Sequence, residues 1–509
     1  MKKIILYFNL LICLFCLHSC IDDTGNYTYI DEESLFPVVI DGLVEDTTVL
    51  KGSILELSPV IINDDPSRYT YSWYIMDYTA QGFVPRQWEL GEGKDLKWEV
   101  SLDPAQYRLE FRIKDDKLDI YTRHEMVVNI TAVPANTGWY VLKDNGSETD
   151  MDYIAFNGER YDNILAAYSE NIPGTAVAMA YQSSRYTHNI ENEDGTVTQK
   201  SNLSAYHIIT SEDIRTYDAK DFTLYKTYED EFYSTPEVCH PQNVIVSSTN
   251  TYLINDGKIH RIYGMLSNIG KFGAPFAGFY DLSGDMIPYG SMNWMVFDRT
   301  TRSFFYIDYN STSLLPIETA TANSYTVPMQ NTNYNLVCSG GNTSELIGTM
   351  IVKDRTDNTS LLIQNQAVYD AENWTYVLNW NTIQTIPAES KVLSTTLMAQ
   401  AAAPSFFYFL YDNSSIYSYV LSEETPLEQR EIERLSFPGE TVTYMTYLSD
   451  YERAEDDYTE ALAVLTSQGG NWKLRIYALL GESTPDLNTT PIREYEGTGT
   501  ARYLLYRSY

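Results

Sequence analysis

Short runs of apolar residues separated by polar turns recur along most of this chain, and long stretches with a helical period are scarce. From Gly138 onward these runs come in pairs. The clearest pair is Tyr252–Ile254 and Ile259–Tyr263, joined by Asn255-Asp256-Gly257-Lys258. Asp-Gly is a strong signal for a tight hairpin turn. The pattern therefore predicts a β-rich chain that is assembled from hairpins.

Seven such hairpins follow one another at intervals of roughly 42 to 66 residues, close to or above the length of propeller repeats. The first strands of these hairpins are Trp139–Leu142, Ala205–Ile209, Tyr252–Ile254, Trp294–Phe297, Thr349–Val352, Phe406–Tyr411 and Leu462–Leu465. Radial repetition leaves few open strand edges, so we expect residues 138–509 to form a β-propeller of seven blades. The last predicted strand, Tyr503–Tyr506, can complete the first blade. Two further sandwiches are the alternative, but no linker interrupts this region.

Residues 34–133 show a different spacing. Strict alternation of apolar and polar residues predicts strands at Ser53–Leu57, Tyr69–Ile75 and Tyr107–Ile113, and a last strand runs through Met126–Ile130. Strands at this spacing are typical of an immunoglobulin-like sandwich. Pro134 and Gly138 mark a short linker to the propeller region.

The N-terminus has the layout of a secretory signal peptide. Lys2 and Lys3 precede an apolar run from Ile4 to Cys16, which is shorter than the ~20 residues that span a bilayer. Leu17-His18-Ser19-Cys20 then fits a bacterial lipobox, with His18 as the unusual residue. We expect residues 1–19 to be removed, Cys20 to be lipidated and residues 20–33 to be an acidic tether. The alternative is an ordinary signal peptide with an incidental cysteine.

Composition restricts the classes of partner. The formal net charge is −34, which repels phosphate backbones and makes a nucleic-acid partner improbable. The lipid is then the only membrane contact that we expect.

Tyrosine is abundant at 43 residues, which suits both strands and recognition surfaces. Cys239 and Cys338 are the two cysteines of the folded body, and one disulfide between them is the less favoured outcome.

No catalytic or metal-binding motif stands out, so we predict no catalytic residue, no metal and no cofactor. The mature histidines are scattered, and no nucleophile elbow or phosphate loop is present. The 69 carboxylates leave open a hydrolase with a paired Asp or Glu. Two acidic runs, Asp354–Asn358 and Glu455–Tyr458, do not match the twelve-residue calcium loop, and solvated loops are the favoured interpretation.

Trp374 and Trp380 flank the predicted strand Tyr376–Leu378. Their even spacing places both on one face of an unbroken strand. They could stack on sugar rings or peptide side chains if that face is open, and packing between blades is the favoured alternative.

Two segments resemble a known family. Tyr71-Ser72-Trp73-Tyr74 and the strand Ala105–Asp115 resemble a PKD-type domain, in which the tryptophan, here Trp73, packs in the core. The whole layout, with Gly138–Lys143 opening the second region, resembles the PKD-like family lipoproteins of Bacteroidetes, and Asp22-Asp23 resembles their signal for export to the cell surface.

The resemblance implies an accessory lipoprotein of a SusC/SusD-type importer on the outer membrane. Its partners would be a TonB-dependent SusC-like barrel and a SusD-like lipoprotein. We therefore expect a non-catalytic surface protein that binds a glycan or peptide nutrient, through residues that the sequence does not identify. A propeller glycoside hydrolase or lyase is one alternative, and a structural docking subunit without a ligand is another.

Overall fold

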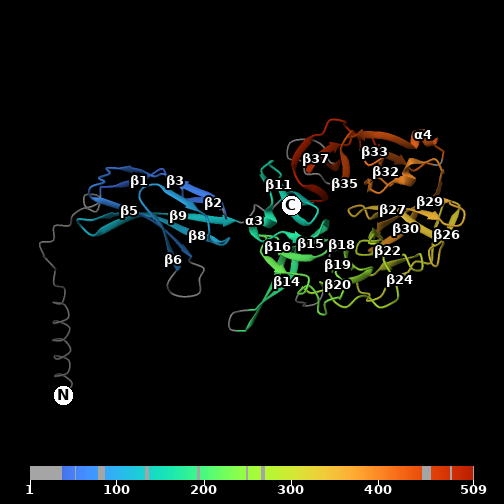
Figure 1. Cartoon of the computed structure of the whole chain (residues 1–509), viewed down its shortest axis with the longest axis horizontal. Coiled ribbons are helices and arrows are strands. Elements are labelled where there is room, and N and C mark those ends of the chain that lie inside the picture. The colour runs from blue at the N-terminus through green and yellow to red at the C-terminus, as the bar shows by residue number, and fades with distance from the viewer. Residues whose placement is uncertain are drawn as a thin grey trace, which may run out of the picture. The chain divides into compact units, whose positions relative to one another are not determined.

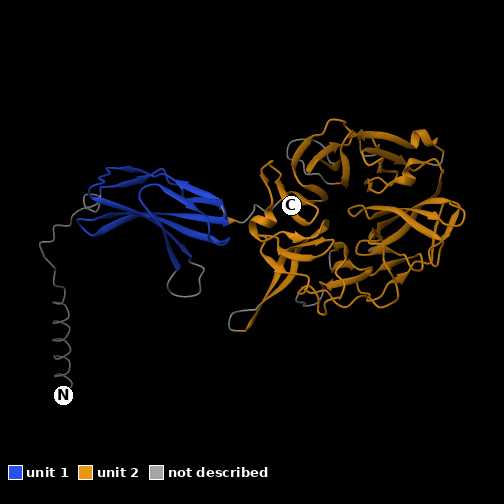
Figure 2. Ribbon diagram, in the orientation of Figure 1, with its two compact units in different colours: residues 1–130 blue, residues 131–509 orange. Residues whose placement is uncertain are grey.

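The computed structural model describes two compact units, divided between Ile130 and Thr131 (Figure 2). It describes residues 37–507 except 52, 78–85, 132–136, 192–194, 248–249, 265–269, 423, 450–459 and 482–483. The predicted signal peptide, Cys20, the tether, most of the linker and the acidic run Glu455–Tyr458 lie outside the described residues.

The N-terminal unit is a β-sandwich. Its large sheet has the strand order β2-β9-β8-β5-β6, and the strand pairs β1-β4 and β3-β7 complete it. The strands are β1 (Val39–Asp41), β2 (Asp46–Leu50), β3 (Ile54–Leu57), β4 (Val60–Ile62), β5 (Tyr69–Asp77), β6 (Arg86–Glu92), β7 (Leu96–Glu99), β8 (Gln106–Asp115) and β9 (Ile120–Thr131).

Trp73 lies at the centre of this sandwich, as the sequence predicted. It is fully buried on β5, and its ring centroid lies 4.5 Å from that of Phe111 on β8. The indole Nε1–H donates a hydrogen bond to the backbone carbonyl of Lys94 at 3.2 Å. The apolar face of each strand therefore packs around one tryptophan whose polar edge is satisfied.

The C-terminal unit contains, among its described residues, seven sheets that follow one another along the chain and a separate hairpin (Figure 1). Sheet 1 is β12-β11-β10-β39 with β13 beside β11, sheet 2 is β14–β17, sheet 3 is β18–β20 and sheet 4 is β21–β24. The hairpin β25-β26 precedes sheet 5 (β27–β30), sheet 6 (β31–β34) and sheet 7 (β35–β38). Each predicted hairpin lies within one of these sheets.

The strands of the first four sheets are β10 (Gly138–Asp144), β11 (Glu148–Ala155), β12 (Arg160–Tyr161), β13 (Ile172–Pro173), β14 (Ala176–Glu191), β15 (Val197–Thr210), β16 (Ile214–Asp218), β17 (Leu224–Lys226), β18 (Pro241–Val246), β19 (Asn250–Asn255), β20 (Lys258–Tyr263), β21 (Ile287–Pro288), β22 (Trp294–Asp298), β23 (Ser303–Ile307) and β24 (Leu315–Pro316). A short helix, α3 (Ile164–Tyr168), lies between β12 and β13.

The later strands are β25 (Thr319–Ala322), β26 (Tyr325–Pro328), β27 (Tyr334–Asn342), β28 (Ile347–Asp354), β29 (Ser360–Asp370), β30 (Thr375–Ile386), β31 (Met398–Gln400), β32 (Phe406–Tyr411), β33 (Ser415–Val420), β34 (Glu431–Ser436), β35 (Thr441–Leu448), β36 (Ala461–Gln468), β37 (Asn471–Ala478), β38 (Arg493–Thr498) and β39 (Thr500–Arg507). The remaining helical turns are η1 (Lys391–Ser394) and α4 (Leu427–Arg430). The described residues include no helix long and apolar enough to cross a membrane.

The last strand closes the ring. β39 pairs antiparallel with β10, from Thr500 opposite Asp144 to Arg507 opposite Gly138. It also contacts β14 of sheet 2 and β35 of sheet 7. The C-terminal strand therefore completes the first sheet, as the sequence predicted, and the all-β propeller prediction is confirmed.

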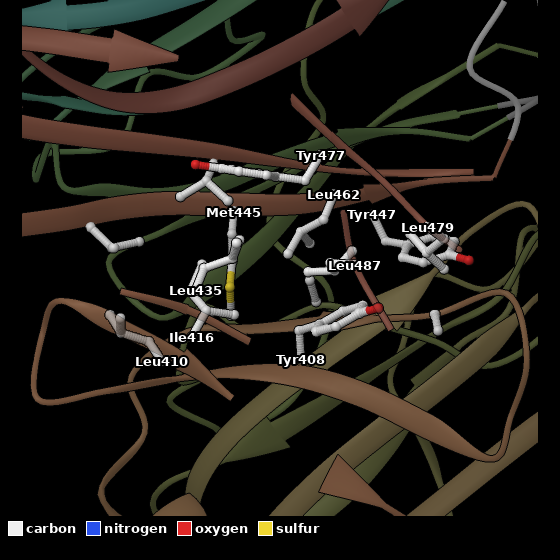
Figure 3. Close-up of a cluster of buried hydrophobic side chains, with 14 of the residues drawn as sticks. Tyr408, Leu410, Ile416, Leu435, Met445, Tyr447, Leu462, Tyr477, Leu479 and Leu487 are labelled. Atoms are coloured by element: carbon white, nitrogen blue, oxygen red, sulfur yellow. The ribbon is translucent and has the colours of Figure 1, made fainter. Parts of the chain in front are cut away.

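A buried apolar cluster fills the interface between each sheet and the next, including the interface between sheets 7 and 1. Figure 3 shows the cluster between sheets 6 and 7, where Tyr408 and Ile416 face Tyr447 and Leu462. The rings of Tyr408 and Tyr447 lie 6.5 Å apart. Sheets that pack face to face in this way bury most of their apolar surface between neighbours.

One fully buried carboxylate links the first sheet to the last. Asp152 on β11 pairs with the Lys143 ammonium of β10 at 2.6 Å and accepts a hydrogen bond from the Asn163 backbone N–H at 2.8 Å. Its second oxygen accepts the indole N–H of Trp472, on β37, at 3.1 Å. The Asp152 carboxylate thus binds donors from both the first and the last sheet of the propeller.

A second buried polar network lies on sheet 2. The His207 ring nitrogens lie 2.9 Å from Thr216 Oγ1 and 2.9 Å from Gln182 Oε1, and the Thr216 hydroxyl also bonds the Glu231 carboxyl. Burial lowers the pKa of His207 to about 3. Burial raises the pKa of Glu231, while the nearby Lys226 opposes that rise. Burial thus disfavours the charged forms of both the His207 imidazole and the Glu231 carboxyl.

Candidate functional site

Two hollows adjoin on one face of the propeller. The first is a central cavity of about 520 Å³, which lies against β14, β18, β21 and β39 and the turn that follows β27. These are the innermost strands of sheets 1 to 5, so the cavity occupies the middle of the ring. The second hollow, the aromatic groove, has a volume of about 570 Å³ and shares Gly290 and Ser291 with the cavity.

Arg507 and Tyr181 line the central cavity, and Arg507 connects it to two fully buried tyrosines, Tyr206 and Tyr140, that do not line it. The Arg507 guanidinium lies 4.1 Å from the ring centroid of Tyr181 and donates a hydrogen bond to the Tyr206 hydroxyl at 3.2 Å. The ring of Tyr206 lies 5.0 Å from that of Tyr140, and burial raises the pKa of Tyr206 to about 12. Among the described residues that line the cavity, Arg507 is the one with a charged side chain.

The aromatic groove is formed by the loop after β21, the end of β23 and the tip of the β29-β30 hairpin. Its lining residues are Tyr289, Gly290, Ser291, Met292, Asn293, Tyr306, Tyr309, Ala367, Trp374, Tyr376 and Leu378. The rings of Tyr289 and Tyr306 pack at 5.2 Å, and burial raises the pKa of Tyr289 to about 12. The Tyr289 phenol is therefore a neutral hydrogen-bonding group at physiological pH.

Trp374 stands at the rim of the groove with 82% of its surface exposed. It occupies the turn between β29 and β30, where the Asp370 carboxylate accepts backbone N–H groups from Glu372 at 2.9 Å and Asn373 at 3.3 Å. The φ angle of Trp374 is 54°, in the left-handed region that bulky residues rarely adopt. The hairpin register places Tyr376 opposite Tyr369, with ring centroids 5.3 Å apart.

The two predicted tryptophans have different environments. Trp380 packs against the apolar cluster between sheets 4 and 5, with its ring 6.2 Å from that of Tyr289, so the packing interpretation is correct for this residue. Trp374 is instead exposed at the groove and lies in the turn just before β30. Even spacing along Trp374, Tyr376 and Leu378 does place all three at one hollow.

Sequence reasoning missed the other groove and cavity residues. Tyr289, Tyr306 and Tyr309 come from loops and strand ends, and Tyr181 and Arg507 come from strands far apart in the chain. The abundance of tyrosine was the one signal, and it did not separate buried rings from exposed ones.

The carboxylates that a hydrolase would need lie in other hollows. Neither the central cavity nor the aromatic groove has an Asp or Glu among its described lining residues. A hollow of about 450 Å³ at sheet 1 is lined by Asp144, Glu148 and Asp150. Burial raises the pKa of Asp150, whose Oδ1 accepts N–H groups from Met151 at 2.7 Å and from Leu165. Asp150 is therefore the carboxyl in this hollow whose pKa is raised, a property that a general acid needs.

A further hollow, of about 420 Å³, lies between sheets 7 and 1 and is lined by Glu440 and Glu496. Arg475 holds Glu440 through two hydrogen bonds, of 2.8 and 2.9 Å, and the pKa of Glu440 is lowered, chiefly by that contact. A carboxylate fixed in this way is a structural anion rather than a proton donor.

Other candidate sites are dispersed. The described residues contain no cluster of three or more side chains suited to a metal ion. Cys239 and Cys338 are both free thiols, and burial raises the pKa of each to about 12. In the Asp354–Asn358 run, Asp354 and Asp357 accept backbone N–H groups within their own turn.

Comparisons with known proteins give one family match and several distant structural likenesses. Matches to solved structures include a quinonprotein alcohol dehydrogenase-like protein from Bacteroides thetaiotaomicron (13% identity, TM-score 0.42, covering 91% of this chain and 97% of that one). The N-terminal domain of Nup159 also matches, with 8% identity and a TM-score of 0.35, over 71% of this chain and 87% of that one. PorZ from Porphyromonas gingivalis matches with 9% identity and a TM-score of 0.27, over 72% of this chain and 54% of that one. These likenesses are too weak to bear on function. No curated protein matches the chain. The PKD-like family matches residues 20–180, so the chain carries a PKD-like family domain at its N-terminal end.

Proposed function

We propose that this protein is a surface lipoprotein that binds a nutrient, a glycan or a peptide, without transforming it. The observation that carries the proposal is the pair of adjoining hollows on one face of the propeller, lined by aromatic rings and lacking carboxylates among their described residues. Concave sites with aromatic walls and a few polar groups are the usual form of ligand sites. Acid–base chemistry would need a positioned, titratable group there.

In this proposal Cys20 carries the lipid anchor, and the PKD-like domain spaces the propeller from the outer membrane. The partners are a SusC-like barrel and a SusD-like lipoprotein, to which the propeller would deliver its ligand. The lipobox at Leu17–Cys20 and the match to the PKD-like family support this part.

Affinity capture of the native membrane complex tests the proposal. The full-length chain, tagged in the described surface turn at Asn145-Gly146, is solubilised in mild detergent, and co-purifying proteins and small molecules are identified by mass spectrometry. We expect a TonB-dependent barrel and a bound nutrient. A barrel without any nutrient would favour the structural docking subunit instead.

The matched control is Cys20→Ala. This variant should leave the membrane fraction and should no longer capture the barrel. If it stays in the outer membrane at the level of the unmodified chain, the lipoprotein part of the proposal is wrong.

A further inference from the structure

We propose that the aromatic groove binds an uncharged saccharide, and that Trp374 supplies the face on which a sugar ring stacks. This inference rests on the proposed function, because it names the ligand class of a nutrient-binding protein. It concerns the groove and makes no use of the central cavity.

The groove is free of charged side chains among its described lining residues, which favours a neutral ligand. The chain carries a net charge of −34, yet no charged side chain is found among the described residues that line the groove. A peptide presents two charged termini and, in most sequences, charged side chains, which bind best where opposite charges can pair with them. A neutral sugar presents hydroxyls and C–H faces. The neutral wall of the groove suits the sugar.

The groove combines aromatic rings with neutral hydrogen-bonding groups. Trp374 and Tyr376 offer ring faces, with 82% and 46% of their surfaces exposed. The negative face of an aromatic ring attracts the polarised C–H groups of a sugar ring. Ser291 and Asn293 lie on the same wall and can bond hydroxyls. Ring faces therefore bind the apolar side of the sugar, and the amide and hydroxyl fix its orientation.

The backbone of the Trp374 turn is strained. A left-handed conformation is unfavourable for a residue with a Cβ. Here it is held by the Asp370 side chain, which accepts hydrogen bonds from the Glu372 and Asn373 N–H groups and from the Asn373 side chain at 2.7 Å. Strain of this kind clusters at ligand sites. The turn thus holds the Trp374 indole in an exposed position, although an apolar ring of this size is usually buried.

One polar atom beside the groove is an unsatisfied acceptor. Asn293 Oδ1 is buried and accepts no hydrogen bond from the residues that the structure describes. A buried acceptor without a hydrogen bond carries the cost of its lost hydration. Rotation of this amide toward a sugar hydroxyl in the groove would remove that cost. The volume of about 570 Å³ suits a short oligosaccharide, because it falls within the ~300–1,000 Å³ that encloses ligands of that size.

The test uses the chain from residue 20 onward, without the predicted signal peptide. It carries Cys20→Ala, so that no lipid is attached. Isothermal titration measures binding to neutral oligosaccharides (glucans, mannans, xylans and galactans of three to six units) and, separately, to mixed peptides of the same length. We expect binding by at least one oligosaccharide. Trp374→Ala should weaken that binding about tenfold or more, because it removes the stacking face.

Two further variants make the result specific. Trp374→Tyr should retain most of the affinity, since it keeps an aromatic face. Phe279→Ala removes an aromatic side chain that is 87% exposed and does not line the groove, and it should leave binding unchanged. Thermal unfolding of each variant checks that the fold is intact.

The outcomes separate the inference from the proposed function. Saccharide binding that is insensitive to Trp374→Ala overturns the groove as its site but leaves nutrient binding in place. Peptide binding without saccharide binding overturns the inference and retains the proposed function. If no oligosaccharide binds, the inference is wrong, and the affinity-capture experiment independently decides whether a nutrient is bound at all.

Discussion

Replacing Asp152 with Asn should destabilise the whole propeller, although the two side chains have the same size. The Asp152 carboxylate is fully buried and lies 2.6 Å from the Lys143 ammonium, whose side chain is 5% exposed. An amide at this position removes the negative charge and leaves a buried cation without its ion-pair partner. It also weakens the acceptor for the Trp472 indole, 320 residues away along the chain.

The magnitude follows from the burial of the pair. Removing one partner of a buried ion pair costs about 3–5 kcal/mol, because the remaining charge is desolvated without compensation. The entropy of unfolding is about 2.1 cal/mol/K per residue, so residues 131–509 give about 0.8 kcal/mol/K. The expected loss then corresponds to a decrease in Tm of about 4–6 °C.

Differential scanning calorimetry of the full chain measures this shift, with Asp162→Asn as the matched control. Asp162 pairs with Arg160 at the same distance of 2.6 Å, but both side chains are substantially exposed, and such pairs contribute about 0.2–1 kcal/mol. The control should therefore shift Tm by about 1 °C or less. Equal shifts for the two variants would refute the reasoning that burial makes Asp152 a clamp between the first and last sheets.

Three other predictions address closure, catalysis and pH. Deleting residues 501–509 removes β39 and should lower the Tm of the propeller unit in calorimetry far more than any single substitution, whereas an unchanged Tm would mean that β39 closes nothing. The purified chain should release no new reducing ends or peptide termini from polysaccharides or peptides; turnover that Asp150→Asn abolishes would instead establish the hydrolase alternative. Because burial raises the pKa of Glu231 to about 7, the folded state holds a proton that the unfolded state loses above about pH 4.5, and stability should fall as the pH rises through that window. Glu231→Gln should flatten this dependence in urea titrations at pH 5 and 8, and an unaltered slope would contradict the assignment.

Much of the fold could be predicted because it depends on local patterns. Alternation along Tyr69–Ile75 and the Asp256-Gly257 turn are properties of a few adjacent residues, and β5 and the β19-β20 hairpin follow from them. Even the pairing of β39 with β10 could be inferred, because closure is a general requirement of a propeller. The hairpin β25-β26 was not predicted, since Thr319–Ala322 and Tyr325–Pro328 are short and contain few strongly apolar residues.

The candidate site could be predicted only in part, because it depends on contacts between distant segments. The even spacing from Trp374 to Trp380 indicated a shared face, but nothing local separates an indole at the groove rim from one against the core. That difference comes from the turn held by Asp370, which places Trp374 just before the start of β30. The neutrality of the groove likewise arises from Tyr289 and Tyr306, which only the ring brings beside the hairpin.

The pairing of β39 with β10 also determines when this protein can fold. β10, which begins at Gly138, can pair with β39 only after Thr500–Arg507 has been synthesised. The propeller therefore cannot be completed until that strand is available. Contacts between such distant segments form slowly, whereas the N-terminal sandwich, complete by Thr131, contains all of its own strand partners. During synthesis the first unit can therefore fold while the second is still unclosed, and the unpaired strand edges of the propeller are exposed in that interval.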